Sequence, residues 1–248
     1  MLMPPATAAG VNPVIAKLDG LAPLGAADRA LLRAVTAERR LVAPASDLIR
    51  QGEPTDAAFV VLDGFACRYK LRKTGMRQIT AYLVPGDICG LGAAALAWSD
   101  HAVGTLAPCR VARIGPEMIG PLLERPSIAA ALRLSRLVEA AIAREWLVSI
   151  GRRSAPERLA HLFCELLVRL QAVGLVGADG YAMPVTQIDL ADTTGLTSVH
   201  VNRSLQDMRK EGLIELRKRR LRILDLPRLR TLAEFDPAYL HLAARSTG

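Results

Sequence analysis

The chain has 248 residues, of which 51% are hydrophobic, so it is long enough for about two domains with apolar cores. Its formal net charge is +8, and this basic balance favours an acidic partner such as nucleic acid or a membrane surface. No apolar run approaches the roughly 18 residues of a membrane-spanning helix, and the N-terminus lacks the basic start of a signal peptide, so we expect a cytoplasmic protein without a membrane partner.

The N-terminal part is predicted to change from helix to sheet. Residues 14–35 are predicted to form one or two short helices. From 39 to 114 the hydrophobic period changes to two, and turn glycines recur at spacings of 12, 11 and 11 residues. Short strands at such spacing are typical of an all-β sandwich or barrel. The turn glycines are Gly52, Gly64, Gly75 and Gly86.

The four cysteines are scattered, and no pair has the two-residue spacing of a zinc or cluster site, so we predict no metal site. In a cytoplasmic protein we expect free thiols that pack as small hydrophobic groups. One alternative stays open, in which Cys67 or Cys109 is a redox switch whose thiolate is stabilised by the neighbouring Arg68 or Arg110. The other two cysteines are Cys89 and Cys164.

Pro126 opens a long predicted helix over residues 127–150, and Gly151 is expected to end it. Its apolar residues fall on a heptad-like row that is broken by Glu145. The helix either packs only within its own chain or joins two chains. We favour dimerisation, because a helix-turn-helix, for which the signals over residues 186–210 are described below, usually binds two DNA half-sites as a symmetric dimer. The row consists of Ala131, Leu134, Val138, Ala141 and Val148.

A further helix is predicted after a hinge at residues 152–154. Ser154 and Glu157 form a capping box with a proline in the first turn, and the apolar row that follows ends near Gly174. A turn at Asp179 and Gly180 then joins two short extended segments.

The next stretch has the signals of two short helices joined by a glycine turn. Thr186 and Asp189 form a capping-box-like start, and Gly195 suits the left-handed turn that ends the first helix. Thr197 is the N-cap candidate of a second helix over 198–210, whose inner face carries apolar residues three and four apart. This is the plan of a helix-turn-helix, in which the second helix enters the major groove of DNA. The simpler alternative is an ordinary helical hairpin in a domain core.

Two apolar-rich runs at 213–216 and 221–224 follow, with a basic tip over 217–220 between them. This pattern predicts a β-hairpin. Placed directly after a candidate recognition helix, the hairpin is expected to be a wing whose basic tip contacts the phosphate backbone. A charge run of this kind is otherwise a solvated loop.

These residues carry a family resemblance. Spacing and residue type over about 28 positions resemble the DNA-binding signature of the Crp/Fnr family of bacterial transcription regulators. The matching residues are Ile188-Asp189-Leu190-Ala191, Gly195-Leu196-Thr197, Val199-His200-Val201-Asn202-Arg203, Leu205 and Gly212-Leu213-Ile214.

The resemblance implies an α+β fold in three parts. An N-terminal double-stranded β-roll, jelly-roll-like and of the cyclic-nucleotide-binding type, is expected over residues 14–125 as the sensor domain. A long dimerisation helix is expected over 126–151, and a C-terminal winged helix-turn-helix over 152–248. The resemblance also implies a homodimeric transcription regulator whose partners are double-stranded DNA and RNA polymerase, with activation and repression both left open.

Arg203 matches the family's most characteristic base-reading arginine, and a bidentate contact from arginine to guanine discriminates by about 1–3 kcal/mol. Val199 stands where well-studied members carry a glutamate; since valine cannot accept a hydrogen bond from cytosine, we expect a different consensus site. The predicted DNA-contacting residues are Thr186, Thr197, Ser198, Val199, His200, Asn202, Arg203, Gln206, Arg209, Lys218, Arg219 and Arg220.

The effector stays unknown. In nucleotide-binding members a glutamate holds the ribose and an arginine holds the cyclic phosphate, but here Leu91 and the Ser99-Asp100 pair stand at these positions, and an aspartate repels phosphate. We therefore expect no cyclic AMP site of the family type. Haem and an iron–sulfur cluster are not expected either, because His101 is the only histidine of the predicted β-roll and the first cysteine is Cys67. The expected pocket region is Gly86, Asp87, Gly90, Leu91, Ser99 and Asp100.

The sequence shows no catalytic constellation: no phosphate-cradling loop, no nucleophile elbow and no paired acids in a recognisable motif. We therefore predict that the protein is not an enzyme. The alternative function is a ligand- or redox-sensing β-roll module that regulates a protein partner, with the C-terminal domain used for contact.

Overall fold

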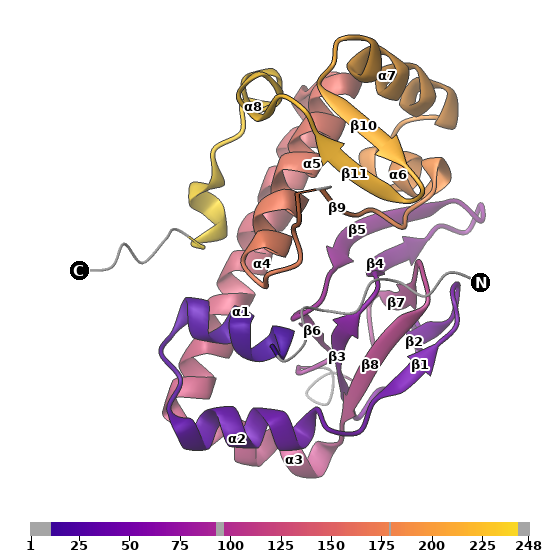
Figure 1. The fold of residues 1–248 in the computed structure, drawn as a ribbon. Coiled ribbons are helices and arrows are strands. Elements are labelled where there is room, and N and C mark those ends of the chain that lie inside the picture. Colours follow the sequence, from indigo (N-terminus) through magenta and orange to yellow (C-terminus); the bar gives the residue numbers. More distant parts are fainter. Residues whose placement is uncertain (1–10, 93–96, 179, 243–248) are drawn as a thin grey trace. The chain divides into compact units, whose positions relative to one another are not determined.

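The computed structural model describes residues 11–92, 97–178 and 180–242. Contacts within the chain divide it into two compact units, residues 1–136 and 137–248, and Figure 1 shows the elements of both. The long helix α4 passes from the first unit into the second. Among the described residues, every helix is too short or too polar to cross a membrane.

The first unit is a β-roll of two four-stranded antiparallel sheets. One sheet has the order β1-β8-β3-β6 and the other has the order β2-β7-β4-β5, which confirms the predicted double-stranded roll. Two helices precede the roll, α1 (Pro13–Leu21) and α2 (Ala26–Val35), and two follow it, α3 (Pro116–Leu123) and α4 (Pro126–Arg152). The strands are β1 (Arg40–Val42), β2 (Asp47–Ile49), β3 (Ala58–Asp63), β4 (Ala66–Leu71), β5 (Arg77–Leu83), β6 (Ile88–Cys89), β7 (Ala102–Thr105) and β8 (Cys109–Ile114).

Strand β3 separates two apolar cores because both of its faces are buried. Phe59 and Val61 point into the space between the two sheets, together with Val103 and Val111. Val60 and its even-numbered neighbours point to the opposite face, where they pack against residues of α1, α2, α3 and the start of α4. The alternation of a strand therefore gives one core to the roll and a second core to its helical cover.

The predicted turn glycines hold positions that side chains rarely adopt, since all four have positive φ angles. Gly64, between β3 and β4, is the most restricted. Its φ is 84°, and a Cβ atom there would lie 2.3 Å from the carbonyl oxygen of Pro108. Only glycine fits this close approach of two backbone segments.

The long helix differs from the prediction at its end. Gly151 was expected to stop it, but α4 continues through Gly151 to Arg152, and Arg153 N still donates to Ser149 O at 3.2 Å. The break comes instead from Ser154, whose extended backbone (ψ 168°) caps the next helix. A capping residue with extended backbone cannot continue the preceding helix. A glycine can, because a helix interior tolerates it at a cost of about 1 kcal/mol.

The predicted apolar row of α4 divides into two groups. Ala131, Val138 and Ala141 are buried against their own chain, whereas Leu134 and Val148 are 38% and 46% exposed. Leu134 and Val148 belong to a neighbouring row with three- and four-residue spacing, consisting of Ala130, Leu134, Leu137, Ala141, Arg144 and Val148, in which Ala141 is buried.

The second unit is built on helix α5 (Ala155–Gln171), which packs against α6, α7 and α8. The apolar row predicted for this helix is buried except at Leu167, which is half-buried; its buried members are Leu159, Leu162, Phe163, Leu166 and Leu170. A three-stranded antiparallel sheet of order β10-β11-β9 completes the unit. The remaining elements are β9 (Tyr181–Ala182), α6 (Gln187–Thr194), α7 (Ser198–Lys210), β10 (Ile214–Arg217), β11 (Arg220–Ile223), α8 (Leu226–Ala233) and the 3₁₀ helix η2 (Pro237–Leu240).

Candidate nucleic-acid interface

Helix α6 begins and ends where the sequence predicted. Thr186 Oγ1 accepts from Asp189 N at 3.1 Å, and the Asp189 carboxylate accepts from Thr186 N at 2.8 Å, which completes the capping box. Gly195 ends the helix with a φ of 67°. Leu190 and Ala191 are buried, but Ile188 is 64% exposed, so this isoleucine is not part of the core.

Helix α7 has one apolar face and one polar face. Thr197 caps it by accepting from His200 N at 3.3 Å. Val201, Leu205 and Met208 are fully buried beneath the helix. The predicted contact residues on the outer face are exposed, with Val199 at 73%. These exposed residues are Ser198, Val199, His200, Arg203, Gln206 and Arg209.

Asn202 differs from these residues because it is half-buried and forms a hydrogen bond between α7 and α6. Its Nδ2 atom donates to Gln187 Oε1 at 3.1 Å, so the two side chains join α7 to the first turn of α6. The sequence pattern gave no sign of this contact, since Gln187 lies 15 residues earlier.

The hairpin after α7 is tighter than predicted. Its strands reach Arg217 and Arg220, which pair directly, so the connection is a two-residue turn of Lys218 and Arg219. Both residues have positive φ angles, 48° and 60°. This conformation is typical of a type I′ turn, which favours Asn-Gly, whereas a left-handed conformation costs other residues roughly 1–2 kcal/mol each. The turn thus carries Lys218 and Arg219 at two positions where a positive φ angle favours asparagine and glycine.

Arg220, the fourth basic residue of the tip, is held by its own domain. Its guanidinium donates to Gly180 O at 2.9 Å and is partly buried, which ties β11 to the turn before β9. Lys218 and Arg219 are exposed. Of the three predicted wing contacts, these two have the freer side chains.

Arg158 is a positioning residue that sequence reasoning missed. Its Nη1 atom donates to Thr194 O, and its Nε atom donates to Arg153 O, each at 2.8 Å. The first bond satisfies a carbonyl at the end of α6, and the second bond holds the junction between α4 and α5. An arginine in the first turn of a helix has no sequence signal that predicts this role.

A buried carboxylate links the scaffold helix to its neighbours. Glu165 is fully buried, and its two oxygens accept from Trp146 Nε1 at 3.0 Å, Tyr239 Oη at 3.0 Å and Arg169 Nη1 at 2.9 Å. Burial raises the pKa of Glu165, and the nearby charge of Arg169 opposes that rise. Three donors around one buried carboxylate join α5, η2 and the second-unit part of α4.

His161 lies beside this cluster and gives the unit a pH dependence. Burial, together with the charge of Arg153, lowers the pKa of His161 to about 4 from its ordinary 6.5. Glu145 Oε2 lies 3.5 Å from His161 Nε2, and this carboxylate also binds Arg153. The positive charge of Arg153 therefore offsets the stabilisation that Glu145 would give to a protonated His161. Between these two pH values the unfolded chain binds more protons than the folded chain.

We therefore expect the free energy of unfolding to decrease as the pH falls from about 6.5 to about 4, by up to about 3 kcal/mol from this residue. Urea unfolding of wild type and His161→Gln over this range measures the effect. The variant should lose less stability across the window. His200→Gln, at an exposed histidine of the same unit, should keep the wild-type pH dependence; equal slopes in all three proteins would contradict the assignment.

The predicted effector-region residues of the first unit are engaged in structural contacts. Asp87 forms a salt bridge with Lys17 and accepts from Val84 N at 2.7 Å, which fixes the turn before β6. Asp100 pairs with His101 at 2.7 Å and with Lys70 at 3.6 Å. Three further residues of the set have local roles: Gly90 has a φ of 84°, Leu91 packs on the helical core, and the Ser99 hydroxyl donates to His101 O.

Gly86 and the segment after its turn are the remaining parts of the expected pocket region. Gly86 has the positive φ expected of its turn, 96°, and a Cβ atom there would lie 2.7 Å from the carbonyl oxygen of Pro13. The family resemblance also implies a short helix after this turn, over residues 93–97, of which only Ala97 lies within the described residues.

All four cysteines are buried, and none of them forms a disulfide. Burial raises the pKa of the Cys109 thiol to about 12, and that thiol donates to Phe65 O at 3.0 Å. Burial also raises the pKa of Cys164 to about 12. A thiol held in its protonated form is a poor redox switch, which disfavours that alternative for Cys109. Within residues 11–92, 97–178 and 180–242, no three potential metal ligands gather at one point.

The order of elements from β9 to β11 is that of a winged helix-turn-helix, and it follows a β-roll and a long helix. Residues 39–125 match the cyclic nucleotide-binding domain family, and residues 157–232 match the Crp-like helix-turn-helix domain family. The nitrogen fixation regulation protein FixK of Bradyrhizobium diazoefficiens is 32% identical over 182 residues, which cover 72% of this chain and 75% of FixK. The chain belongs to the Crp/Fnr family of transcription regulators.

Further Crp/Fnr proteins show the same likeness. The transcriptional activatory protein AadR of Rhodopseudomonas palustris is 29% identical over 198 residues, covering 77% of this chain and 79% of AadR. The solved structure of FixK2 from Bradyrhizobium japonicum has a TM-score of 0.67 and 24% identity, and covers 79% of this chain and 96% of that chain. The resemblance stated from the recognition-helix signature is therefore confirmed, and the protein is a transcription regulator with a helix-turn-helix DNA-binding domain.

Proposed function

We propose that this Crp/Fnr regulator acts in the cytoplasm as a homodimeric activator that binds a palindromic site in double-stranded DNA through α7. The observation that carries the proposal is the exposed polar face of α7, held in place by a buried apolar face and by caps at both helices. Transcription activation further requires contact with RNA polymerase. AadR is named as an activatory protein, which supports activation over repression.

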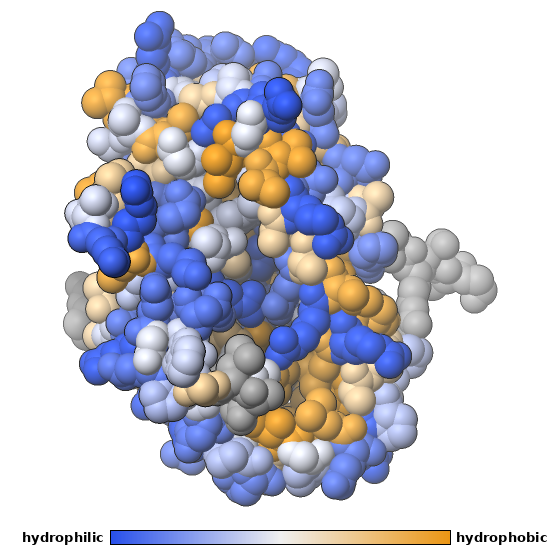
Figure 2. Space-filling model, turned by 180° about the vertical axis from the view of Figure 1, so that it is seen from behind, coloured by the Kyte–Doolittle hydropathy of each residue, from blue (hydrophilic) through white to orange (hydrophobic). Residues whose placement is uncertain are grey.

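The dimer is supported by the exposed apolar residues of the Ala130–Val148 row on α4. Leu134, Leu137 and Val148 are 38%, 61% and 46% exposed. Figure 2 shows how apolar patches interrupt an otherwise hydrophilic surface. A row of this kind with heptad spacing fits the same row of a second copy. A symmetric pair of recognition helices then reads two half-sites.

Selection of binding sites from a randomised duplex pool, with no ligand added, tests the function. We expect enrichment of a two-fold symmetric motif with half-sites about one helical turn apart. Loss of binding as salt increases would exclude the alternative of a sensor that acts only on a protein partner. If no sequence is enriched, with or without cell extract, the proposed DNA-reading function is wrong.

We further propose that cyclic AMP is not the effector. The position of the phosphate-binding arginine is occupied by Ser99 and Asp100, and Asp100 is already paired with Lys70 and His101. A carboxylate at this point disfavours an anionic phosphate. Calorimetric titration with cyclic AMP should give no saturable heat, and saturable binding would contradict the proposal.

The wing is proposed to contact phosphate through Lys218 and Arg219. If these residues are retained for DNA rather than for folding, the double change Lys218→Asn and Arg219→Gly should stabilise the hairpin, because Asn and Gly suit positive φ. We expect about 1 kcal/mol of added stability, measured by urea unfolding, together with weaker DNA binding and a smaller salt dependence.

The control for the wing variant is Lys73→Asn, which removes one exposed charge from a turn of the first unit. It should change DNA binding much less than the wing variant does. Lower stability of the double variant, or unchanged DNA affinity, would show that the two basic residues serve the fold instead.

A further inference from the structure

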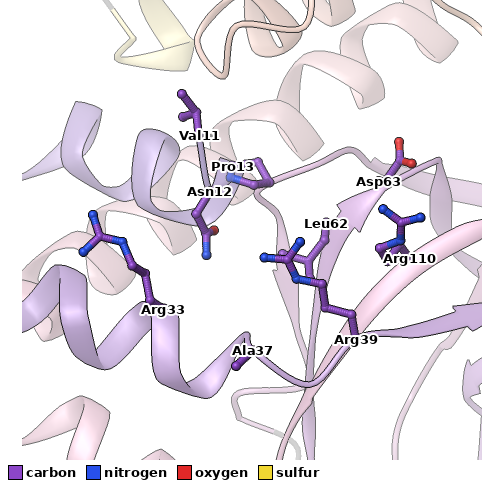
Figure 3. A pocket seen from close by; sticks show the side chains of 9 residues that line it. All are labelled: Val11, Asn12, Pro13, Arg33, Ala37, Arg39, Leu62, Asp63 and Arg110. Carbon is purple, nitrogen blue, oxygen red and sulfur yellow. The ribbon is translucent and has the colours of Figure 1, made fainter. Parts of the chain in front are cut away.

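A cavity of about 420 Å³ lies in the first unit where the helical cover meets the rim of the β-roll. Its walls come from the start of α1, the end of α2 and the outer face of β3 and β8. Figure 3 shows Arg39 and Arg110 beside Leu62 and Asp63, with Arg33 on the other side of Asn12. Cavities of about 300–1,000 Å³ are the size that small ligands occupy. None of the predicted effector-region residues lines it.

The cavity is strongly basic. Three arginines line it against one carboxylate, that of Asp63. Among the described residues, neither Arg33 nor Arg110 forms a salt bridge within 4.0 Å. Other arginines of this unit do: Arg113, on the same strand as Arg110, pairs with Asp56 at 3.1 Å, and Arg125 pairs with Asp28 at 2.8 Å. Arg33 and Arg110 are therefore left with donors for an external anion, whereas Arg39 Nε already donates to Thr36 O at 3.4 Å.

The walls are held together by a specific contact. Asn12 Oδ1 accepts from Val14 N at 3.1 Å and caps α1, while Asn12 Nδ2 donates to Thr36 Oγ1 at 2.7 Å. The Thr36 hydroxyl in turn donates to Leu32 O at 2.6 Å. The start of α1 is thus fixed to the end of α2, so the cavity is formed before any ligand binds, which lowers the entropic cost of binding.

The backbone register fixes Arg110 on the sheet side of the cavity. Arg110 on β8 lies between Leu41 of β1 and Asp63 of β3, and it belongs to the alternate set of β8 residues that face the helical cover. Leu62 gives the cavity an apolar wall beside it. One oxygen of Asp63 accepts from its neighbour Gly64 N at 2.9 Å, which leaves the second oxygen for a hydroxyl donor.

We propose that this cavity binds a small organic phosphate that also carries hydroxyl groups. Guanidinium groups bind phosphate oxygens by charge-assisted, often paired hydrogen bonds, the apolar wall suits a carbon skeleton, and the Asp63 carboxylate accepts from a ligand hydroxyl. The ligand joins the helical cover of the roll to β8 when it is bound. The proposal concerns the first unit alone and holds whether or not the protein binds DNA as proposed.

The test is calorimetric titration of the full-length protein with ribose 5-phosphate, with inorganic phosphate and ribose as separate probes. We expect saturable binding of ribose 5-phosphate that is tighter than that of either separate probe. Arg110→Ala and Arg33→Ala should each weaken it by about 10-fold or more, as expected for loss of a hydrogen bond to a charged group. Arg113→Ala removes the same charge from the same strand outside the cavity and should bind like wild type.

Three results would overturn the proposal. The absence of saturable binding at millimolar concentration would exclude the site, and an equal loss in all three variants would show only a general effect of charge. Binding of inorganic phosphate as tight as that of ribose 5-phosphate would remove the part played by hydroxyl groups. Circular dichroism checks that each variant is folded. If Arg110→Ala does not fold, the binding affinity of Arg33→Ala, a change on a helix surface, tests the proposal.

Discussion

Leu137→Glu is expected to convert the protein from a dimer to a monomer and to weaken its binding to a two-fold symmetric DNA site by at least about 100-fold. Leu137 is the most exposed large apolar residue of the Ala130–Val148 row on α4, at 61%. In the proposed dimer the two α4 helices pack through this row. A glutamate in the seam leaves a charge without a partner in each chain, and burying such charges costs several kcal/mol.

Light scattering coupled to size-exclusion chromatography measures the mass of the variant, and fluorescence anisotropy measures its DNA affinity. The matched control is Ala143→Glu, which adds the same charge at an exposed position on the flank of the same helix. Ala143→Glu should remain a dimer with nearly wild-type affinity. A dimeric Leu137→Glu protein would show that α4 is not the dimerisation surface.

The reading motif was the part of the fold most fully predicted from sequence, because its signals are local. The Thr186–Asp189 capping box, the left-handed Gly195 and the Thr197 cap each act within four residues, and all three are in place. The turn glycines of the β-roll were predicted for the same reason. A positive φ angle is decided by the residue that adopts it and its immediate neighbours.

Features that depend on distant residues were not predicted. The apolar row of α4 could not be divided into intrachain and exposed parts, because burial depends on elements far away in sequence. Gly151 does not end α4, because the stronger helix-ending signal lies three residues later, at the N-cap Ser154. The bond from Arg220 to Gly180 spans 40 residues and appears only when β9 is placed beside β11.

The same reasoning explains why the basic cavity had no sequence signal. Its arginines lie at positions 33, 39 and 110, on a helix end, a loop and a strand. In the sequence, Arg110 stands out only as the neighbour of Cys109. Neighbouring residues of a strand point to opposite faces of the sheet, so Cys109 lies in the core and Arg110 lines the cavity.

Arg203→Ala is expected to weaken binding to the selected DNA site by about 10- to 100-fold for each half-site and to reduce selectivity at one base pair in each half. Arg203 lies in the second turn of α7 on its exposed face. Among the described residues it forms no salt bridge, unlike Arg217, which pairs with Glu215 at 2.8 Å. Its guanidinium therefore needs no rearrangement within the protein before it meets a guanine edge.

The matched variant Arg203→Lys separates base reading from simple attraction to phosphate. Lysine keeps the charge but loses the planar pair of donors, so it should retain non-specific binding and its salt dependence while losing most of the selectivity. Anisotropy titrations against the selected duplex and a shuffled duplex, at two salt concentrations, measure both quantities. If Arg203→Ala discriminates between the two duplexes as well as wild type does, Arg203 is not the base-reading residue, and the specificity has to come from other residues on the exposed face of α7.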